Sequence, residues 1–428
     1  MKRSIIWAVI ALTMMATSTL TGCSSDSDNE KPEPTICPGE KLTMELTRTE
    51  QQMVERSNEF AFDLFRTAQD NKESQILSPI SIIYALGMLN NGADGETLAQ
   101  INKVLGFSNT GADGINAFCY RMLNAAPTLD SLTKVMIANN IYVNKYYELK
   151  TDFVQKANIY YNAEPETRDF NDGHTMDVIN QWASNHTEQM IEKVLDQNSF
   201  NPNAVSYLLN AIYFKGSWAK KFDKAMTVND NFMCAMRPDE FEECGPLNSV
   251  PMMHQTATFE YAENDDYQAL RLPYGNGSFR MTVLLPTYKG NNYWTVPRVP
   301  TAEDWQQLSQ KMDSTLVDVR LPRFETDTDI DLKDIMSTLG MKDAFDDEKA
   351  DFRNFCNVPV YIELMKQVAK IKLDEEGTEA AAVTVIGVAN SIGPAPEYVT
   401  FNANHSFLYV ISEQKSGAVF FIGQYTGN

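Results

Sequence analysis

Residues 375–396 read EEGTEAAAVTVIGVANSIGPAP, a segment whose composition is typical of a strand but whose position is unusual. Small and β-branched residues dominate it, which favours a strand over an amphipathic helix or a polar loop. Side chains of a strand alternate between its two faces, so one face would carry only uncharged residues, namely Thr378, Ala380, Ala382, Thr384 and Ile386. Glu379 has the opposite parity and would face solvent.

The same segment has a sharply defined end. Proline is absent from residues 378–393 and follows at once as Pro394 and Pro396. Proline cannot donate to a strand ladder and is excluded from central strands. The segment is therefore suited to enter the middle of a sheet as far as about residue 391. Taken alone, the pattern fits an ordinary buried strand or an alanine-rich connector equally well.

Around this segment, helical patterns come first in the chain and strand patterns dominate later. We expect helices over residues 49–70, from 78 onward, 94–105 and 175–195. Thr49 and Ser78 are the expected N-caps, and Pro79 fits a first helical turn. Strands are expected over residues 135–143, 205–214, 279–285, 317–321, 360–373, 407–411 and 419–424. This order predicts an α+β fold with large antiparallel sheets.

Composition and motifs exclude several classes of function. The 428 residues are 43% hydrophobic, enough for a large core in one or two domains. A net charge of −21 argues against nucleic-acid binding, because the phosphate backbone would be repelled and no basic patch offsets this. No nucleophile elbow or phosphate-binding loop occurs. The histidines also lack metal-ligand spacing: His174, His186, His254 and His405. We therefore expect neither an enzyme nor a metal or cofactor site.

The first 22 residues have the features of a lipoprotein signal peptide. Lys2 and Arg3 precede an apolar stretch that ends in Leu20-Thr21-Gly22-Cys23, which resembles the bacterial lipobox. The resemblance implies cleavage before Cys23 and lipidation of Cys23, which would anchor the protein to a membrane. A transmembrane anchor is the weaker alternative, because the apolar stretch is shorter than the roughly 20 residues that span a bilayer.

Residues 23–44 are rich in Ser, Asp, Pro and Glu and read as a flexible tether. The acidic run at residues 25–28 resembles the export tags of surface lipoproteins. We expect an outer membrane lipoprotein that faces the periplasm or the cell surface.

Five cysteines remain after Cys23, and their spacing matches no zinc ligand set. Cys234 and Cys244 could close a small disulfide loop in an oxidising compartment. Cys119 and Cys356 lie in apolar surroundings and are expected to be buried free thiols.

Several further motifs, in one order along the chain, resemble the serpin family. The family's hinge stands here as Glu376, Gly377, Thr378, Glu379, Ala380, Ala381 and Ala382. Residues 209–218 (LNAIYFKGSW) are similar to the strand that carries the family's central Asn and the Trp at the top of its main sheet. Other matching stretches are residues 78–81 (SPIS), 250–253 (VPMM), 321–324 (LPRF), 350–352 (ADF) and 405–423. The resemblance runs from about residue 50 to 425.

The resemblance implies the serpin fold, with a large mixed central sheet, two further sheets, about eight or nine helices and an exposed reactive loop. The fold would occupy residues 45–428, with the loop at about 375–398. Ser78, Ser81 and Asn210 would form the shutter beneath the sheet, and Trp218 would lie at its top. Gln367 stands where the family often has a shutter His. An amide can both donate and accept, so it can take over that role.

The resemblance also implies a function, namely inhibition of endopeptidases as a suicide substrate. Counting fourteen residues from Gly377 places the scissile bond between Ser391 and Ile392. Residues 376–396 contain no Arg or Lys, which favours elastase-like or subtilisin-like serine proteases, with papain-like cysteine proteases as a further class. The expected partner is the target protease, bound covalently by a monomer. The alternative is a non-inhibitory serpin that acts as a binding or carrier module.

Overall fold

The computed structural model describes residues 42–70, 72–233, 248–287, 296–378 and 397–427, and these belong to one compact unit. The predicted signal peptide, most of the tether, Cys23, Cys234 and Cys244 lie outside the described residues. So do Glu379, Ala380, Ala381, Ala382, Ser391 and Ile392.

The described residues contain eight α-helices, in agreement with the eight or nine expected. Their bounds are α1 Arg48–Ala68, α2 Pro79–Asn90, α3 Gly95–Val104, α4 Gly111–Ala125, α5 Thr151–Tyr161, α6 Thr175–His186, α7 Ala302–Gln310 and α8 Lys333–Leu339. Helix α1 begins earlier than expected, because Thr47 rather than Thr49 forms a capping box with Glu50. Helix α6 ends at His186 rather than at residue 195, because Glu188 and Gln189 adopt positive φ angles that an α-helix does not accommodate.

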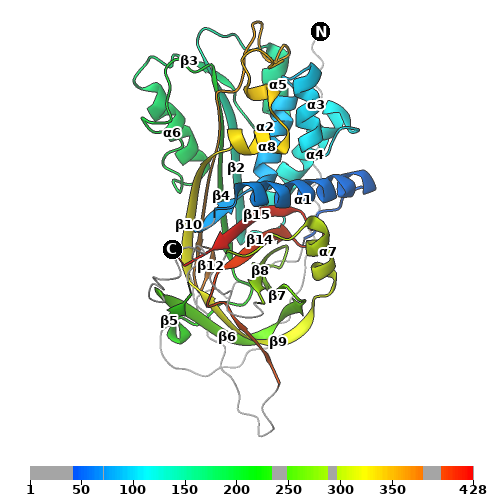
Figure 1. Cartoon of the computed structure of the whole chain (residues 1–428), viewed down its shortest axis with the longest axis vertical. Coiled ribbons are helices and arrows are strands. Elements are labelled where there is room, and N and C mark those ends of the chain that lie inside the picture. Colours follow the sequence, from blue (N-terminus) through cyan, green and yellow to red (C-terminus); the bar gives the residue numbers. More distant parts are fainter. Residues whose placement is uncertain (1–41, 71, 234–247, 288–295, 379–396, 428) are drawn as a thin grey trace, which may run out of the picture. The chain divides into compact units, whose positions relative to one another are not determined.

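A six-stranded mixed sheet has the strand order β10-β11-β4-β2-β3, with the short β12 paired to β4. The strands are β2 Thr133–Asn144, β3 Glu166–Arg168, β4 Ser206–Ser217, β10 Phe324–Asp331, β11 Leu364–Leu373 and β12 Gly377–Thr378. Strand β11 starts at Leu364 rather than at residue 360. Figure 1 shows these long strands running beside the cluster of helices.

The remaining strands form a nine-stranded sheet in the order β1-β15-β14-β8-β7-β6-β9-β13, with β5 also paired to β6. Their bounds are β1 Gln75–Leu77, β5 Val228–Phe232, β6 Asn248–Glu263, β7 Tyr267–Pro273, β8 Phe279–Pro286, β9 Asp313–Pro322, β13 Val399–Asn402, β14 Phe407–Glu413 and β15 Val419–Tyr425. The 16-residue β6 joins the two smaller expected sheets, because one end pairs with β7 and the other with β5.

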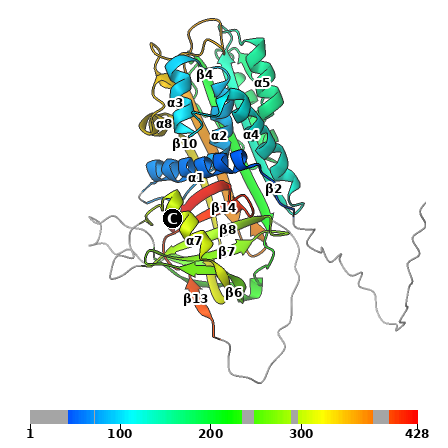
Figure 2. The same ribbon diagram turned by 90° about the vertical axis from the view of Figure 1, so that its right-hand side faces the viewer.

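Helix α2 lies at the centre of the core, and all twelve of its residues are buried. It contacts β2 and β4 of one sheet and β15 of the other (Figure 2). Helix α6 packs on the opposite face of the six-stranded sheet, where Ile179 and Ala183 meet Leu209 and Ala211. Strand β4 is therefore covered on both faces, which explains its continuous apolar run.

Candidate functional site

The predicted shutter residues meet at the middle of the six-stranded sheet. Gln367 on β11 and Asn210 on β4 are register partners, and both are buried. The side-chain amide of Gln367 donates to Asn210 Oδ1 at 2.6 Å and lies 2.9 Å from Ser81 Oγ. Its Oε1 accepts from the backbone N–H of Ser78 at 3.0 Å. Gln367 thus joins two strands of the sheet to the start of α2.

Two further bonds extend this network. Asn210 Nδ2 donates to Asn139 Oδ1 on β2 at 2.7 Å, which ties a third strand to the group. Ser78 Oγ donates to the carbonyl of Phe420 on β15 at 2.8 Å. Ser78 occupies the N-cap position of α2, but its side chain makes no capping bond. The expectation that Ser78 caps the helix is therefore wrong, because its hydroxyl links α2 to the second sheet instead.

Above the shutter, β4 and β11 are no longer paired with each other, so among the described residues the central sheet is open at this end. Strands β4 and β11 pair in parallel from Tyr207 opposite Leu364 as far as Tyr213 opposite Lys370. Strand β11 then continues to Leu373 with β10 as its neighbour. On the β4 side, Gly377 and Thr378 form antiparallel pairs with Ser217 and Gly216. The hinge residues Gly377 and Thr378 thus lie beside the end of β4, where β11 no longer pairs with it.

This placement corrects the expectation that the loop is outside the sheet from residue 375. Thr378 is fully buried on the core face, and its hydroxyl lies 3.0 Å from that of Tyr274. Burial raises the pKa of Tyr274, so its phenol stays protonated and can donate this bond. The Tyr274 ring stacks on Trp218, with centroids 4.4 Å apart and planes inclined by 11°. Gly377 and Thr378 are therefore part of the sheet, and Glu375 and Glu376 form the turn that precedes them.

Trp218 fixes the turn that leads into the hinge. Its indole N–H donates to the carbonyl of Asp374 at 2.9 Å, and its backbone N–H donates to Glu376 at 2.8 Å. Gly377 has a φ of 139°, and a Cβ there would lie 2.1 Å from the carbonyl oxygen of Gly216. Only glycine fits this close approach of two backbones.

Two buried carboxylates hold the same turn through ion pairs. Glu375, with 2% of its side chain exposed, accepts from Arg323 at 2.9 Å and from Thr227 Oγ1 at 2.7 Å. Glu376, with 5% exposed, pairs with Lys221 at 2.8 Å and with Lys224 at 3.2 Å. Removing Arg323 would leave the buried charge of Glu375 without an opposite charge, which costs several kcal/mol, whereas Glu376 would keep one lysine after loss of the other.

Four of these partners could not be identified as site residues from the sequence: Tyr274, Arg323, Lys221 and Lys224. Each is close in space to the hinge but more than 50 positions from Gly377 in the chain. The carboxylates of Glu375 and Glu376 indicate that basic partners are needed, but their positions in the sequence do not indicate which residues these partners are.

Three further features of the described residues concern other kinds of site. They contain no group of His, Cys, Asp and Glu side chains that could hold a metal ion. No described helix is long and apolar enough to cross a membrane. Cys119 and Cys356 are buried free thiols, as expected, and burial raises the pKa of Cys119 to about 12, which leaves it unreactive.

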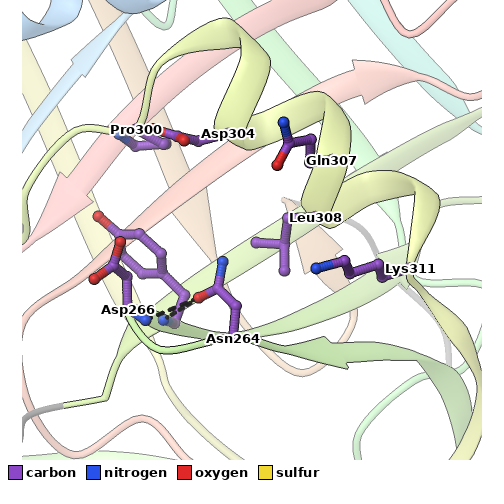
Figure 3. Close-up of a pocket in the computed structure, with 8 residues that line it drawn as sticks. Asn264, Asp266, Pro300, Asp304, Gln307, Leu308 and Lys311 are labelled. Atoms are coloured by element: carbon purple, nitrogen blue, oxygen red, sulfur yellow. Dashed lines mark hydrogen bonds between the residues drawn. The ribbon is translucent and has the colours of Figure 1, made fainter.

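Two hollows are also separate from the hinge. The first, shown in Figure 3, is a cavity of about 50 Å³ beside Asn264, Asp304 and Lys311, between the β6–β7 turn and α7. The second, of about 210 Å³, is an open groove beside β2. Neither is lined by a hinge or shutter residue.

The shutter yields a first prediction. Replacing Gln367 by Leu would leave the Ser78 N–H and Asn210 Oδ1 with fewer partners in a dry core, so we expect the native state to lose about 2–4 kcal/mol of stability. Urea denaturation measures this. Gln367→His is the matched control and should retain most of the stability, because imidazole can also donate and accept. Equal stability of the Leu variant and the wild type would show that the network does not hold the sheet.

Comparisons with known proteins agree with this geometry. The family model described as serpin (serine protease inhibitor) matches residues 55–427. Human Serpin B3 is 32% identical over 396 residues, which cover 87% of this chain and 98% of that protein. The crystal structure of the thermophilic serpin tengpin in the native state superposes with a TM-score of 0.79 at 28% identity, covering 90% of this chain and 95% of tengpin. Human thyroxine-binding globulin is 23% identical and superposes with a TM-score of 0.77, covering 89% of this chain and 99% of the globulin, a likeness that shows only a shared fold. The chain therefore belongs to the serpin family.

Proposed function

We propose that the protein inhibits endopeptidases as a suicide substrate, and the observation that carries this proposal is the open end of the central sheet. Gly377 and Thr378 already pair with β4 in the antiparallel direction. A strand that continued from Thr378 would run down between β4 and β11 and bond to both. The hinge is thus the first step of an insertion that cleavage of the loop would complete.

The existing register predicts where each loop residue would go. Thr378 pairs with Gly216 in the antiparallel direction. Thr384, six residues after Thr378, would therefore lie opposite Asn210, six residues before Gly216. The bridge between Asp374 and Gly377 likewise places Thr384 opposite Gln367. Insertion would therefore separate Asn210 and Gln367, whose hydrogen bond closes the sheet, and would put a hydroxyl between them. Thr384 shares the face of Thr378, so this hydroxyl would point toward the shutter serines.

In this mechanism the protease supplies the groups that break the peptide bond. Its nucleophile attacks the carbonyl carbon of Ser391, the bond to the nitrogen of Ile392 breaks, and the new amine leaves with a proton. Residues up to Ser391 stay attached to the protease as an acyl-enzyme. A strand of about fourteen residues gains roughly 1 kcal/mol for each new ladder bond, so insertion is favourable by more than ~10 kcal/mol. It would draw the acylated protease along before water releases it.

The alternative is a carrier, and thyroxine-binding globulin in complex with thyroxine shows that this fold can serve a binding function. The core-facing hinge positions favour inhibition here. They carry Thr378, Ala380 and Ala382, none of which is bulky or charged.

The second prediction tests inhibition and the site of cleavage together. We expect pancreatic elastase or subtilisin to form an SDS-stable complex with the protein, and trypsin to form none, because the loop lacks Arg and Lys. Mass spectrometry of the released fragment should show an N-terminus at Ile392. Cleavage with full release of active protease by every member of the panel would contradict the proposal.

The third prediction tests insertion itself. Thr378 is already buried, so its substitution would disturb the uncleaved protein. Ala380 is the better position, because by register it would lie between Phe214 and Ile371 on the core face. Ala380→Arg would bury an unpaired charge at a cost of several kcal/mol, and 1.4 kcal/mol on the insertion barrier is tenfold in rate. Gels should show cleavage at the same bond with almost no covalent complex.

Glu379 supplies the control for this experiment. After insertion in this register, Glu379 would lie on the outer face between Lys215 and Lys372, neither of which forms an ion pair within the described residues. Glu379→Gln should keep most of the inhibition, whereas Glu379→Lys should lose more of it and regain it when combined with Lys215→Glu. Complex formation by Ala380→Arg at the wild-type rate would rule out insertion in this register.

For localisation, we propose an outer membrane lipoprotein anchored through Cys23. The fourth prediction is that Cys23→Ala abolishes labelling with a fatty-acid probe and releases the protein from the membrane fraction. Labelling and partitioning like the wild type would refute the anchor. A Cys37→Ala control should behave as the wild type, because Cys37 lies outside the lipobox-like motif.

A further inference from the structure

Four polar side chains gather on one face of the nine-stranded sheet, across three neighbouring strands. Arg271 on β7 lies opposite Thr282 on β8, and Arg280 on β8 lies opposite Ser412 on β14. Strands β7, β8 and β14 are side by side (Figure 2). Because Arg280 and Thr282 are two positions apart on one strand, all four side chains project from the same face. We call this group the arginine cluster.

The arginine cluster faces away from the hinge and the shutter. Phe279 on β8 has the opposite parity, and its ring centroid lies 6.2 Å from that of Phe214 on β4. Alternation along β8 therefore turns Arg280 and Thr282 away from the six-stranded sheet. The proposed inhibition gives the cluster no role.

Each member of the cluster has a buried polar atom without a hydrogen-bond partner among the described residues. These atoms are Arg271 Nε, Arg280 Nε, Thr282 Oγ1 and Ser412 Oγ. Arg271 is only 7% exposed, and the two hydroxyl residues are fully buried. Buried donors and acceptors are nearly always paired in native proteins, so an unpaired group points to a bound water or ion. Four such atoms on one patch of sheet point to a binding site.

The charge of the cluster favours an anion over water. Burial lowers the pKa of both guanidinium groups, and the neighbouring charge of Arg271 lowers that of Arg280 further, to about 10. Both groups thus stay charged at neutral pH and repel each other. Glu260 on β6 pairs with them, at 3.0 Å from Arg271 and 3.8 Å from Arg280. The charge of Glu413 also favours charged Arg280, but Glu413 accepts from Ser416 and forms no ion pair among the described residues.

Glu260 is the part of this group that water reaches. Its side chain is 49% exposed, whereas those of Arg271 and Arg280 are 8% and 14% exposed. A half-exposed carboxylate can turn into water at little cost. An anion that took its place would meet two guanidinium groups at once. Each guanidinium presents five N–H donors in a planar fork, which matches the oxygens of phosphate or sulfate.

We propose that the arginine cluster binds a tetrahedral oxyanion, phosphate or sulfate, in the place of the Glu260 carboxylate. The donors belong to several strands and do not lie along one line, so they suit a tetrahedral anion better than a planar carboxylate. The hydroxyls of Thr282 and Ser412 add further donors beside the guanidinium groups. The anion is either the free ion or the same group carried by a larger molecule.

Isothermal titration calorimetry of the uncleaved protein, at constant ionic strength, tests this with inorganic phosphate, inorganic sulfate and acetate. We expect one site for phosphate and sulfate, with affinity about tenfold higher than for acetate. The thermal unfolding midpoint should rise by about 5–10 °C at a hundredfold excess of phosphate over its Kd. Glucose 6-phosphate separates the two sources: tighter binding than inorganic phosphate indicates a group on a larger molecule, and weaker binding indicates the free ion.

Two substitutions should change phosphate binding in opposite directions. Arg280→Gln should weaken it about tenfold or more, because one of the two cations is lost. Glu260→Gln should tighten it about tenfold, because the competing negative charge is lost. Arg56→Gln is the matched control and should bind as the wild type, since Arg56 is an exposed arginine on α1 that pairs with Glu59. If Arg280→Gln fails to fold, Glu260→Gln decides the test, because it changes a half-exposed side chain to one of nearly equal shape.

A purely structural role for the cluster predicts a different result. Glu260→Gln would then lose stability, and phosphate would not restore it. That result would overturn the proposal. So would phosphate binding that is equal in Arg280→Gln and the wild type, which would show an adventitious ion only. No protease enters the experiment, so failure of the proposed inhibition would leave this test intact.

Discussion

Strands β4 and β11 pair along only part of their length, and the rest of the structure depends on that constraint. Strand β4 has twelve residues, but its pairing with β11 stops at Tyr213. Beyond this point the two strands have no ladder bonds to each other, and the hinge residues Gly377 and Thr378 take the place of one partner. A sheet that is closed at the middle and open at one end can admit a strand from that end alone.

Opposing sets of interactions act on this opening. The network of Gln367, Asn210 and Ser81 closes the middle of the sheet. Trp218 and the ion pairs of Glu375 and Glu376 fix the turn at its top. Both sets are made of a few bonds, whereas an inserted strand would form a new ladder on each of its edges. A small number of local contacts thus opposes insertion, whereas the inserted strand would gain more free energy from its new ladder bonds.

The sequence predicts which residues form the hinge segment and the shutter, but not at which residue the hinge leaves the sheet. Alternation along residues 378–386 correctly places Thr378 on the core face, because side-chain parity is a local property of a strand. It does not reveal that Thr378 already lies in the sheet, since this depends on where β4 and β11 part. The same limit applies to Ser78, whose position before α2 indicates a cap, while its hydroxyl is used by Phe420 on a strand more than 300 residues away.

The helix ends show the same division between local and distant causes. The start of α3 has a local cause, because Asp94 is its N-cap and accepts from the backbone N–H of Gly95. Helix α6, in contrast, ends at His186 although its apolar spacing continues, because the next residues turn to cover β4 instead. Partners of the hinge such as Arg323 and Tyr274 are set by the fold as a whole, so no spacing in the chain could identify them.

The claim that the open end of the sheet accepts the cleaved loop can be measured without any inhibited protease. Thermolysin is suitable for cutting the loop, because a metalloprotease uses an activated water, forms no acyl-enzyme and cannot be trapped. The thermal unfolding midpoint of the intact and the cut protein is then compared. Insertion worth more than ~10 kcal/mol should raise the midpoint by tens of degrees, given about 2–4 °C for each kcal/mol in a large domain. A midpoint that stays the same or falls after cleavage would contradict the account.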